Sequence, residues 1–558
     1  MSLFAPSKLP ISNKDVVSFT FDNPTYDIDR PVFIDPHDPS NNFSPRRAKS
    51  LVRRLISGLK AAGLQPGDTV CIHSFNSLIF PLVALAIIGA GGRSTGTNPS
   101  YTSHELCHTI KIARVRFFLV EPEIVSNVLV AMRQSGLDPQ ERLLILDAQP
   151  DDQVPKGLKS WKSLLEYGEQ DWIRFDDEES SNRICQLFFT SGTTGLPKCT
   201  MTSHRNLVAQ HQIFAQPNPR NYVYREVLCL PFFHAGIYPR VVISAIKEGW
   251  EGYVLRRFDV EPFLRFHSKY TMTEIFVVPP MMVSILNSGL ADPKSKNYLP
   301  ECNLRSVRNG TTGAAPCSAD IQRKFSRLLG KNATMTQVWG MTEATCVVSM
   351  VPWDIAERTA RGEIDTWGTV GKLLPNLQVK LVDEEGSDVT HLGRGEICVR
   401  GPTVIQGYFE NEQATRESWD ADGFYKTGDL IRVGEHGLMY VEGRAKELIK
   451  VRGFQVAPAE LEGELTAHSG IDDAAVIGVT FENNDELPRA YIVRTPGSNL
   501  TETLVHEHMK ARLAGYKQLA GGIKFVTSIP KLASGKILKR VLREDAKREL
   551  RAEARVKL

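Results

Sequence analysis

Between residues 45 and 190, predicted helices and strands alternate, and this alternation limits the fold more than any other feature of the sequence. From Pro45 to Leu64, leucines recur near helical spacing among arginine and lysine residues, which predicts an amphipathic helix. The β-branched run from Thr69 to His73 then predicts a strand. Alternation of this kind is typical of a parallel sheet with helices on both faces. The series continues with helices at 78–90, 103–113 and 122–135 and with strands at 115–120 and 142–147.

A loop rich in glycine and hydroxyl groups follows a short apolar run, Ile184 to Phe189, which predicts a buried strand. Two glycines in the loop can adopt positive φ, so backbone N–H groups can converge as an anion-binding nest. A lysine at its end adds a point charge suited to a phosphate. The order is not that of a Walker A loop, and composition alone leaves both a flexible connector and a phosphate site open. The candidate phosphate-binding residues are Thr190, Ser191, Gly192, Thr193, Thr194, Gly195 and Lys198.

At 558 residues the chain exceeds the size at which one hydrophobic core stops growing, so two or more domains are expected. The net charge of +3 is small for this length and argues against a nucleic-acid partner. The nine cysteines form no C-x-x-C pair and are typical of reduced thiols in an intracellular protein. The first 19 residues lack the apolar region of a secretory signal, and the longest apolar stretch, Leu78 to Ala90, is too short for a transmembrane segment.

The last three residues, Val556-Lys557-Leu558, are similar to the Ser-Lys-Leu peroxisomal signal but have valine where a small residue is preferred. A chance C-terminus ending in Lys-Leu is the alternative. We therefore expect an intracellular, cytoplasmic protein, with peroxisomal targeting by this tripeptide as the second destination.

The second half of the chain changes character near residue 368. Before that point, runs at 227–230 and 275–278 predict strands, residues 307–316 predict a strand followed by a glycine-rich turn, and residues 318–329 predict a helix. From Gly368 to Arg444, short strands separated by Gly, Pro and Asp predict a small β-rich subdomain. The remainder has a βαββα-like pattern and about 110 residues, which is enough for a separate domain.

Several further residues suit a nucleotide. Glu343, next to the hydroxyl of Thr342, offers a hard oxygen for a Mg²⁺ ion that is bound mainly through phosphates and water. Trp339 could stack on a purine, although a core tryptophan is the plainer interpretation. Asp429 could accept hydrogen bonds from ribose hydroxyls, or it could simply stabilise a turn. Lys536 lies on a small-residue loop that could swing, although a solvated loop lysine is the common case.

Five segments occur in the order and spacing of the adenylate-forming superfamily, which comprises acyl- and aryl-CoA ligases, luciferases and the adenylation domains of peptide synthetases. The resemblance runs from about residue 50 to residue 545. Within the superfamily, residues 447–450, 453–462 and 535–538 are most similar to 4-coumarate–CoA ligases and their relatives. The five segments are Thr190 to Lys198, Trp339 to Glu343, Tyr425 to Asp429, Lys446 to Glu462 and Pro530 to Lys536.

The resemblance implies an α/β fold. It has a large N-terminal adenylation domain, residues 1–445, made of two parallel-rich α/β sheets and the small β-rich subdomain. A small mobile α+β domain, residues 446–558, rotates about a hinge at Lys446. The implied reaction uses ATP, Mg²⁺ and coenzyme A. A small carboxylic acid first becomes an acyl-adenylate with release of pyrophosphate, and coenzyme A then displaces AMP to give a thioester.

The matching positions imply roles for individual residues. The loop from Thr190 to Lys198 would hold the β- and γ-phosphates, Glu343 would hold Mg²⁺, and Asp429 and Arg444 would bind the ribose. Catalytic roles fall on Lys536, which neutralises charge on the α-phosphate, on Thr342 and on Lys450. Arg257, Arg452 and Gly453 would bind coenzyme A. The remaining nucleotide-binding positions are Gly313, Ala314, Ala315, Gln337, Val338, Trp339, Gly340, Met341 and Gln455.

The predicted acid pocket departs from that of coumarate ligases. Ala235 and Gly236 follow His234 where those enzymes have a pocket tyrosine two residues after the histidine, and Arg240 stands where they have a small hydroxyl residue. These differences argue against a standard hydroxycinnamate pocket. We interpret His234 as a gate at its mouth, with a purely structural histidine as the alternative. The predicted pocket residues are His234, Gly236, Tyr238 and Gly310.

Other positions also depart from the family pattern. Trp339 replaces a common tyrosine, Cys199 replaces the glycine after Lys198, and Gly443 replaces the aspartate before Arg444. Two rival functions stay open on the sequence. One is an adenylating enzyme with another acceptor, as in a luciferase-like oxygenase or a carrier-protein loading enzyme. The other is an inactive binding homologue. The oligomeric state and the identity of the acid do not follow from the sequence.

Overall fold

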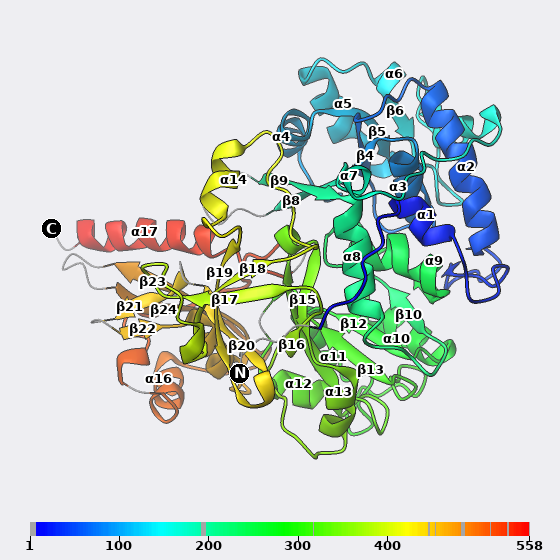
Figure 1. Ribbon diagram of the computed structural model, residues 1–558. Helices are drawn as coiled ribbons and strands as arrows, with labels where there is room; N and C mark the ends of the chain where they lie inside the picture. Colours follow the sequence, from blue (N-terminus) through cyan, green and yellow to red (C-terminus); the bar gives the residue numbers. More distant parts are fainter. Residues whose placement is uncertain are drawn as a thin grey trace.

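The computed structural model describes residues 7–190, 197–315, 317–444, 447–451, 454–480, 486–513, 515–532 and 535–556. Figure 1 shows a large body of sheets and helices on the right and a smaller body at the left, made of the C-terminal elements. The predicted α/β class is confirmed. None of the helices in the described ranges combines the length and the hydropathy that a bilayer crossing requires.

The largest sheet in the described part of the chain has seven strands in the order β7-β6-β5-β3-β4-β8-β9. Its strands pair in parallel except at one edge, where β8 and β9 are antiparallel and Thr190 is paired with Lys198. This pairing brings the two ends of the predicted phosphate loop together. The strands are β3 (Thr69–His73), β4 (Arg93–Gly96), β5 (Val115–Val120), β6 (Leu143–Ile145), β7 (Lys159–Ser160), β8 (Ile184–Thr190) and β9 (Lys198–Ser203).

Helices of the first half cover this sheet, as the alternating pattern predicted. The side chain of Ser44 caps α2 (Pro45–Ala61) by accepting from the backbone N–H of Arg47, and the apolar stripe of the helix is buried. Every residue of α3 (Phe80–Gly89) is buried, so the longest apolar stretch of the sequence is a core helix. The other helices here are α1 (Val16–Phe21), α4 (Ser103–Ala113), α5 (Val125–Gln134), α6 (Pro139–Arg142), α7 (Glu178–Ser181) and α8 (His204–Ala215).

The second large sheet expected from the sequence is divided into two. One sheet has the order β10-β11-β1-β2, and the other runs from β12 to β16. In the latter, β12, β13 and β14 are parallel, whereas β15 and β16 are antiparallel additions. The strands are β1 (Phe33–Ile34), β2 (Asn42–Phe43), β10 (Arg225–Leu228), β11 (Glu251–Val254), β12 (Glu274–Val277), β13 (Asn309–Thr312), β14 (Met335–Met341), β15 (Cys346–Met350) and β16 (Lys372–Leu373).

Short helices flank these two sheets. The segment after β10 includes a π-helical turn, η3 (Arg240–Ser244), which continues directly into α9 (Ala245–Glu248). Single π-helical turns occur often at functional sites. The remaining helices are α10 (Val260–Lys269), α11 (Pro279–Ser288), α12 (Ala319–Ser326) and α13 (Trp353–Ala360).

The β-rich subdomain is an antiparallel sheet in the order β17-β18-β19-β20, as its short, punctuated strands predicted. It lies between the large body and the C-terminal body in Figure 1. The strands are β17 (Gln378–Val382), β18 (Arg394–Arg400), β19 (Tyr425–Val433) and β20 (Met439–Arg444), and α14 (Glu412–Ser418) connects β18 to β19.

The C-terminal body has its own apolar core. Two buried clusters, formed by residues between 449 and 550, include no residue of the N-terminal part among those described. The predicted domain boundary at Lys446 lies outside the described residues and stays a prediction. The elements are β21 (Ile449–Val451), β22 (Phe454–Val456), α15 (Pro458–Thr466), β23 (Ile471–Thr480), β24 (Glu486–Arg494), α16 (Glu502–Lys510), β25 (Ile523–Phe525) and α17 (Lys539–Val556).

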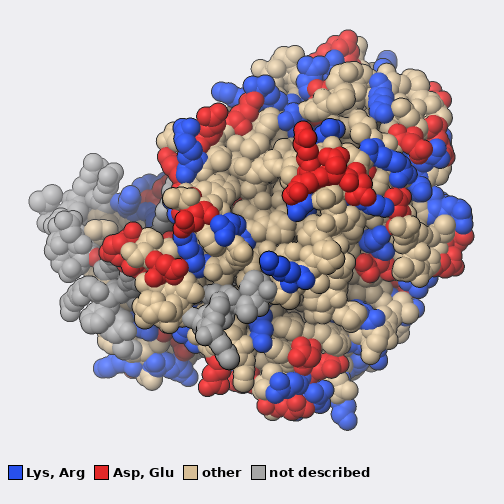
Figure 2. Space-filling model, viewed as in Figure 1, with Lys and Arg blue, Asp and Glu red and all other residues tan. Residues whose placement is uncertain are grey.

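Charged side chains are spread over the face of the molecule seen in Figure 2, with lysine and arginine interspersed among aspartate and glutamate. This mixture agrees with the small net charge of +3.

Candidate active site

Asp429, on β19, is held at both carboxylate oxygens. Nε of Arg444, its register partner on β20, lies 2.9 Å from Oδ1, and the indole N–H of Trp339 donates to Oδ2 over 2.8 Å. Asp429 is 5% exposed, and burial raises its pKa against the opposing effects of Arg444 and Trp339. The carboxylate therefore has a fixed position, which suits recognition of vicinal hydroxyls.

Glu343 lies in η4 (Thr342–Ala344), the short 3₁₀ turn directly after β14. The hydroxyl of Tyr408 donates to its Oε1 over 3.1 Å. Burial raises the pKa of Glu343, while Tyr408 and the positive charges of Arg444 and Lys536 act in the opposite direction. A carboxylate that burial has partly deprived of water gains from a cation, so this donor fits Mg²⁺. No cluster of three or more possible protein ligands for a metal occurs among the described residues.

Lys198 and Glu343 contact the same aromatic residue. The ammonium of Lys198 lies 4.7 Å from the centre of the Tyr408 ring, and the hydroxyl of that ring reaches Glu343. The hydroxyl of a second tyrosine, Tyr425, lies 3.0 Å from the Tyr408 hydroxyl. Tyr408 thus connects the predicted phosphate lysine with the predicted magnesium carboxylate. Nothing in the sequence marks Tyr408 as a site residue, because a Gly-Tyr pair in a loop carries no charge or spacing signal.

Lys536 comes to this site from the C-terminal body. Burial lowers the pKa of Lys536, as does the charge of Arg444, whereas Glu447, Asp429 and Glu343 act to raise it. The preceding Gly535 has φ +82°, and a Cβ there would lie 2.7 Å from Cγ of Pro280 at the start of α11. The loop therefore approaches the large body as closely as glycine allows. In this arrangement the predicted catalytic lysine is grouped with the predicted ribose and magnesium carboxylates.

The loop after β13 carries the expected glycine and alanine residues in a strained conformation. Ala314 has φ +68°, in the left-handed region that residues with a Cβ rarely occupy. A Cβ on Gly313 would lie 2.8 Å from Cγ2 of Val338, so this loop packs directly on β14. The side chain of Gln337 donates to the carbonyl of Cys317 and to Oε1 of Gln322, both over 3.0 Å. Its Nε2 therefore joins β14 to α12.

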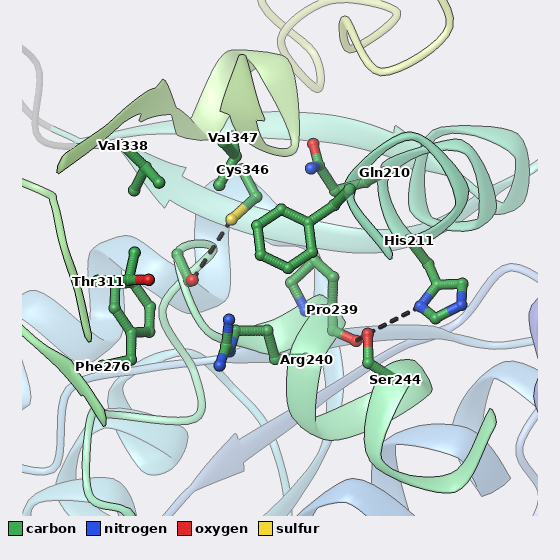
Figure 3. A pocket seen from close by; sticks show the side chains of 12 residues that line it. Gln210, His211, Pro239, Arg240, Ser244, Phe276, Thr311, Val338, Cys346 and Val347 are labelled. Carbon is green, nitrogen blue, oxygen red and sulfur yellow. Dashed lines mark hydrogen bonds between the residues drawn. The ribbon is translucent and has the colours of Figure 1, made fainter. Parts of the chain in front are cut away.

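A pocket lies between α8, η3 and β15 (Figure 3). Predicted pocket residue Gly236 lines it, and its carbonyl accepts from the thiol of Cys346 at 3.3 Å. Apolar and aromatic side chains form most of the wall: Phe214, Pro239, Phe276, Val338, Cys346 and Val347. The polar lining residues are Gln210, His211, Arg240, Ser244 and Thr311.

Two predicted pocket residues lie outside this lining, and their substrate-binding role stays a prediction. Tyr238 lies outside this lining, because its ring is buried edge-on against Phe188 with the centroids 5.2 Å apart. Gly310 faces the core, where a Cβ would meet Leu329 and Met335 at 3.1 Å, and its neighbour Thr311 lines the pocket instead. Successive side chains of a strand point to opposite faces, which explains why Thr311 and not Gly310 of β13 lines the pocket.

His234 is not part of the lining, although its imidazole stays close to it. Nδ1 accepts from the backbone N–H of Gly236 over 3.0 Å, and burial lowers the histidine pKa. The imidazole therefore favours its neutral form and braces the turn that holds Gly236. The gate role stays a prediction.

Other predicted residues lie apart from the site or outside the described ranges. Arg257 pairs with Glu123 at 2.6 Å and stacks on Phe75, and no contact among described residues links it to Glu343. Cys199 is buried in β9, and burial raises its thiol pKa to about 12. For Lys450 and Gln455 only the backbone is described. The predicted residues outside the described ranges are Ser191, Gly192, Thr193, Thr194, Gly195, Lys446, Arg452 and Gly453.

Comparison with known proteins assigns this arrangement to a class. Residues 22–409 match the family described as AMP-binding enzyme, and residues 460–536 match the AMP-binding enzyme C-terminal domain. The chain therefore belongs to the AMP-binding enzyme family, and the predicted superfamily is confirmed.

Relatives cover nearly the whole chain. Phenylacetyl-CoA ligase epaB of Aspergillus niger is 43% identical over 541 residues, which are 96% of this chain and 97% of the relative. Acyl-CoA ligase azaF of Aspergillus niger is 42% identical over 539 residues, which are 96% of this chain and 98% of the relative. The crystal structure of ATP-bound MatB from Rhodopseudomonas palustris is 26% identical with a TM-score of 0.81, covering 96% of this chain and 99% of that one.

Proposed function

We propose that this protein is an acid–CoA ligase that uses ATP and Mg²⁺ to convert a small carboxylic acid into a CoA thioester through an acyl-adenylate. The convergence of Lys536, Glu343 and the Asp429–Arg444 pair carries this proposal. These groups come from two bodies of the fold and have complementary charges for a nucleotide and its metal. The full-length relatives named as CoA ligases support the same class of reaction.

In the first step, an oxygen of the acid carboxylate bonds to the α-phosphorus of ATP while the bond to pyrophosphate breaks. Lys198 would contact the departing phosphates and Lys536 the α-phosphoryl oxygens, where negative charge develops. Asp429 and Arg444 would hold the ribose, which fixes the α-phosphate in line with the acid. Mg²⁺ held by Glu343 would neutralise phosphate charge.

In the second step, the sulfur of coenzyme A bonds to the acyl carbon and AMP leaves. We propose that the C-terminal body, residues 446–558, then rotates about Lys446, so that Lys536 withdraws and the segment with Lys450, Arg452, Gly453 and Gln455 replaces it. The separate apolar core of this body supports its motion as a unit. Arg257 would reach the phosphates of coenzyme A after releasing Glu123.

The defining experiment measures both half-reactions. Purified protein is incubated with ATP, Mg²⁺ and single acids, with pyrophosphate release and acyl-AMP followed before coenzyme A is added and the thioester followed by mass spectrometry afterwards. We expect an adenylate and then a thioester with at least one acid. An adenylate that coenzyme A does not consume would indicate another acceptor. No adenylate with any acid would exclude the proposed reaction.

We also propose peroxisomal delivery through the last three residues. The similarity of Val556-Lys557-Leu558 to the Ser-Lys-Leu signal supports this proposal. Fluorescent fusions with and without Val556-Lys557-Leu558 test this. Peroxisomal fluorescence that depends on the tripeptide is expected, and diffuse fluorescence for both fusions would contradict it.

A further inference from the structure

The pocket of Figure 3 contains a buried cation. Arg240 begins the π-helical turn η3 and lies between aromatic rings, with its guanidinium carbon 4.9 Å from the centre of the Phe276 ring and 5.7 Å from that of Phe214. The side chain is 11% exposed. A charged residue in such surroundings is expensive unless it is paired, so its partners indicate its role.

The charge of Arg240 is already matched. Its Nη2 lies 2.7 Å from Oε2 of Glu226 and also donates to the hydroxyl of Tyr224, which itself donates to Glu226 over 2.9 Å. Burial acts to lower the pKa of the guanidinium, but the charge and hydrogen bond of Glu226, together with Tyr224 and Glu274, outweigh burial, so the pKa is raised. The pair is therefore a fixed, overall neutral unit beside the pocket.

The hydrogen bonds of Arg240 are not all satisfied. Its Nε–H is buried and has no hydrogen-bond partner among the described residues. A second pocket residue, Gln210, is 2% exposed, and its buried Oε1 also lacks a partner in the described part of the chain. Buried polar groups in native proteins are nearly always hydrogen-bonded, so two such atoms in the lining of one pocket point to a ligand that supplies the partners.

This inference rests on the proposed function and specifies its substrate. We infer that the acid has a flat aromatic body with a neutral hydrogen-bonding oxygen, of the hydroxyl or carbonyl kind, that accepts from Arg240. The apolar and aromatic side chains that form most of the pocket wall suit the ring. A second carboxylate on the acid is disfavoured, because Glu226 already balances the arginine and an added anion would leave net negative charge in a buried site.

A purely structural Arg240 is the competing explanation. The Arg240–Glu226 ion pair connects η3 to β10. If Arg240 served only this structural role, the enzyme would show no preference for an acid with a polar ring substituent. The chain provides a matched control for this possibility. Arg220 and Glu274 form a second buried pair, with Nε 2.7 Å from Oε1, and neither residue lines the pocket.

The test uses matched phenylacetates and benzoates that carry hydrogen, hydroxyl, methyl or carboxyl at each ring position. The kcat/KM of adenylation is measured for the wild type, R240M/E226Q and R220M/E274Q. Both variants remove a whole ion pair, because removing one partner would strand a buried charge. R240K, which keeps the charge but not the Nε–H, is added in case the first double variant does not fold.

At one ring position, the wild type should favour hydroxyl over the methyl isostere by roughly 10- to 100-fold, as expected for a hydrogen bond from a charged donor. R240M/E226Q should lose this preference while still accepting the methyl acid, R240K should reduce it, and R220M/E274Q should retain it. Three results would overturn this inference and leave the proposed function intact. They are equal rates for hydroxyl and methyl acids at every ring position, a preference of the wild type for the carboxyl acids, and an unchanged hydroxyl preference in R240M/E226Q. Failure of the wild type to adenylate any acid in a broad library would overturn the proposed function and this inference with it.

Discussion

The indole N–H of Trp339 donates a hydrogen bond over 2.8 Å to Oδ2 of Asp429, a residue 90 positions further along the chain. The opposite oxygen of the same carboxylate is bound by Arg444. Trp339 is buried, and its indole orients this carboxylate. The replacement of a common tyrosine by tryptophan at this position therefore has a structural consequence.

Trp339→Phe should keep an aromatic ring but lose the bond to Asp429. A hydrogen bond to a charged group contributes about 1.5–3 kcal/mol, so kcat/KM for ATP should fall about 10- to 100-fold. Steady-state pyrophosphate release at varied ATP measures this change. The matched control is Trp353→Phe, because Trp353 lies at the start of α13, away from Asp429. An unchanged kcat/KM for ATP in Trp339→Phe would show that Arg444 alone fixes the carboxylate.

Tyr408→Phe should change the pH dependence of Mg²⁺ binding. Burial raises the pKa of Glu343, and the Tyr408 hydroxyl lowers it in part. Mg²⁺ needs the deprotonated carboxylate, so affinity for the ion falls as the pH drops through this raised pKa. Without the Tyr408 hydroxyl, the pKa of Glu343 rises further. The acid limb of the pH profile, where Mg²⁺ affinity falls, should therefore move to higher pH.

The half-saturating Mg²⁺ concentration, measured between about pH 5 and 8 at saturating ATP, reports this shift. Tyr440→Phe is the control, because the Tyr440 ring lies under Arg432 at 4.4 Å and belongs to the outer part of β20. An acid limb that stays in place or moves to lower pH in Tyr408→Phe would contradict the assigned role.

Lys536→Ala should separate the two half-reactions. Loss of a preorganised cation at the α-phosphate costs about 3–4 kcal/mol, or roughly 10²–10³ in the rate of adenylation. Conversion of supplied acyl-adenylate to thioester should continue. Lys531→Ala, which removes a charge paired with Asp473, should leave both steps nearly unchanged. Equal losses in both half-reactions of Lys536→Ala would refute the role of Lys536.

The lowered pKa of Lys536 also leads us to expect that adenylation declines at alkaline pH. Burial and the nearby Arg444 lower its pKa, so the free enzyme loses the positive charge at lower pH than an ordinary lysine would. The kcat/KM for ATP should therefore decline on the alkaline side, since this parameter reports the free enzyme. Lys536→Arg, which stays charged, should remove the decline if it retains measurable activity. The same alkaline limb in Lys536→Arg would assign it to another group.

Gly535→Ala should block the approach of the Lys536 loop. The added Cβ would meet Pro280 at 2.7 Å, and φ +82° disfavours alanine even without that contact. Gly497 has φ +81°, and a Cβ added there would have no described atom within 4 Å, so Gly497→Ala carries the same backbone strain without the collision. Adenylation should fall sharply in Gly535→Ala only, with thioester formation from supplied adenylate preserved. Equal adenylation rates in Gly535→Ala and Gly497→Ala would show that a collision with Pro280 does not block the loop.

Much of the site could be predicted because its signals are local. The strand before Thr190, the turn that carries Thr342 and Glu343, and the position of Asp429 all follow from short stretches of sequence and their resemblance to a family. Gln337 shows the limit of such motifs. It occupies an expected position, yet its side chain bonds to Cys317 and Gln322, because the direction of a side chain depends on what packs against the strand.

The pocket was less predictable for the same reason. Gly310 and Thr311 are neighbours on one strand, and only the packing of Leu329 and Met335 shows which of them faces the core. Tyr408 contacts Glu343 across 65 positions of sequence, and no pattern in the intervening chain marks that pairing. Arg240 appeared in the sequence only as a departure from a family pattern.

The sequence by itself determined the alternation of helices and strands, the β-rich subdomain and the family, because periodicity, glycine positions and motif spacing are properties of short segments. Tertiary structure alone decided that Tyr408 connects Lys198 with Glu343, that Trp339 orients Asp429, and that Arg240 is buried with a neutralising partner and an Nε–H that no described residue accepts. Burial and long-range contact set the energy of each charge, and both depend on which distant segments the fold brings together.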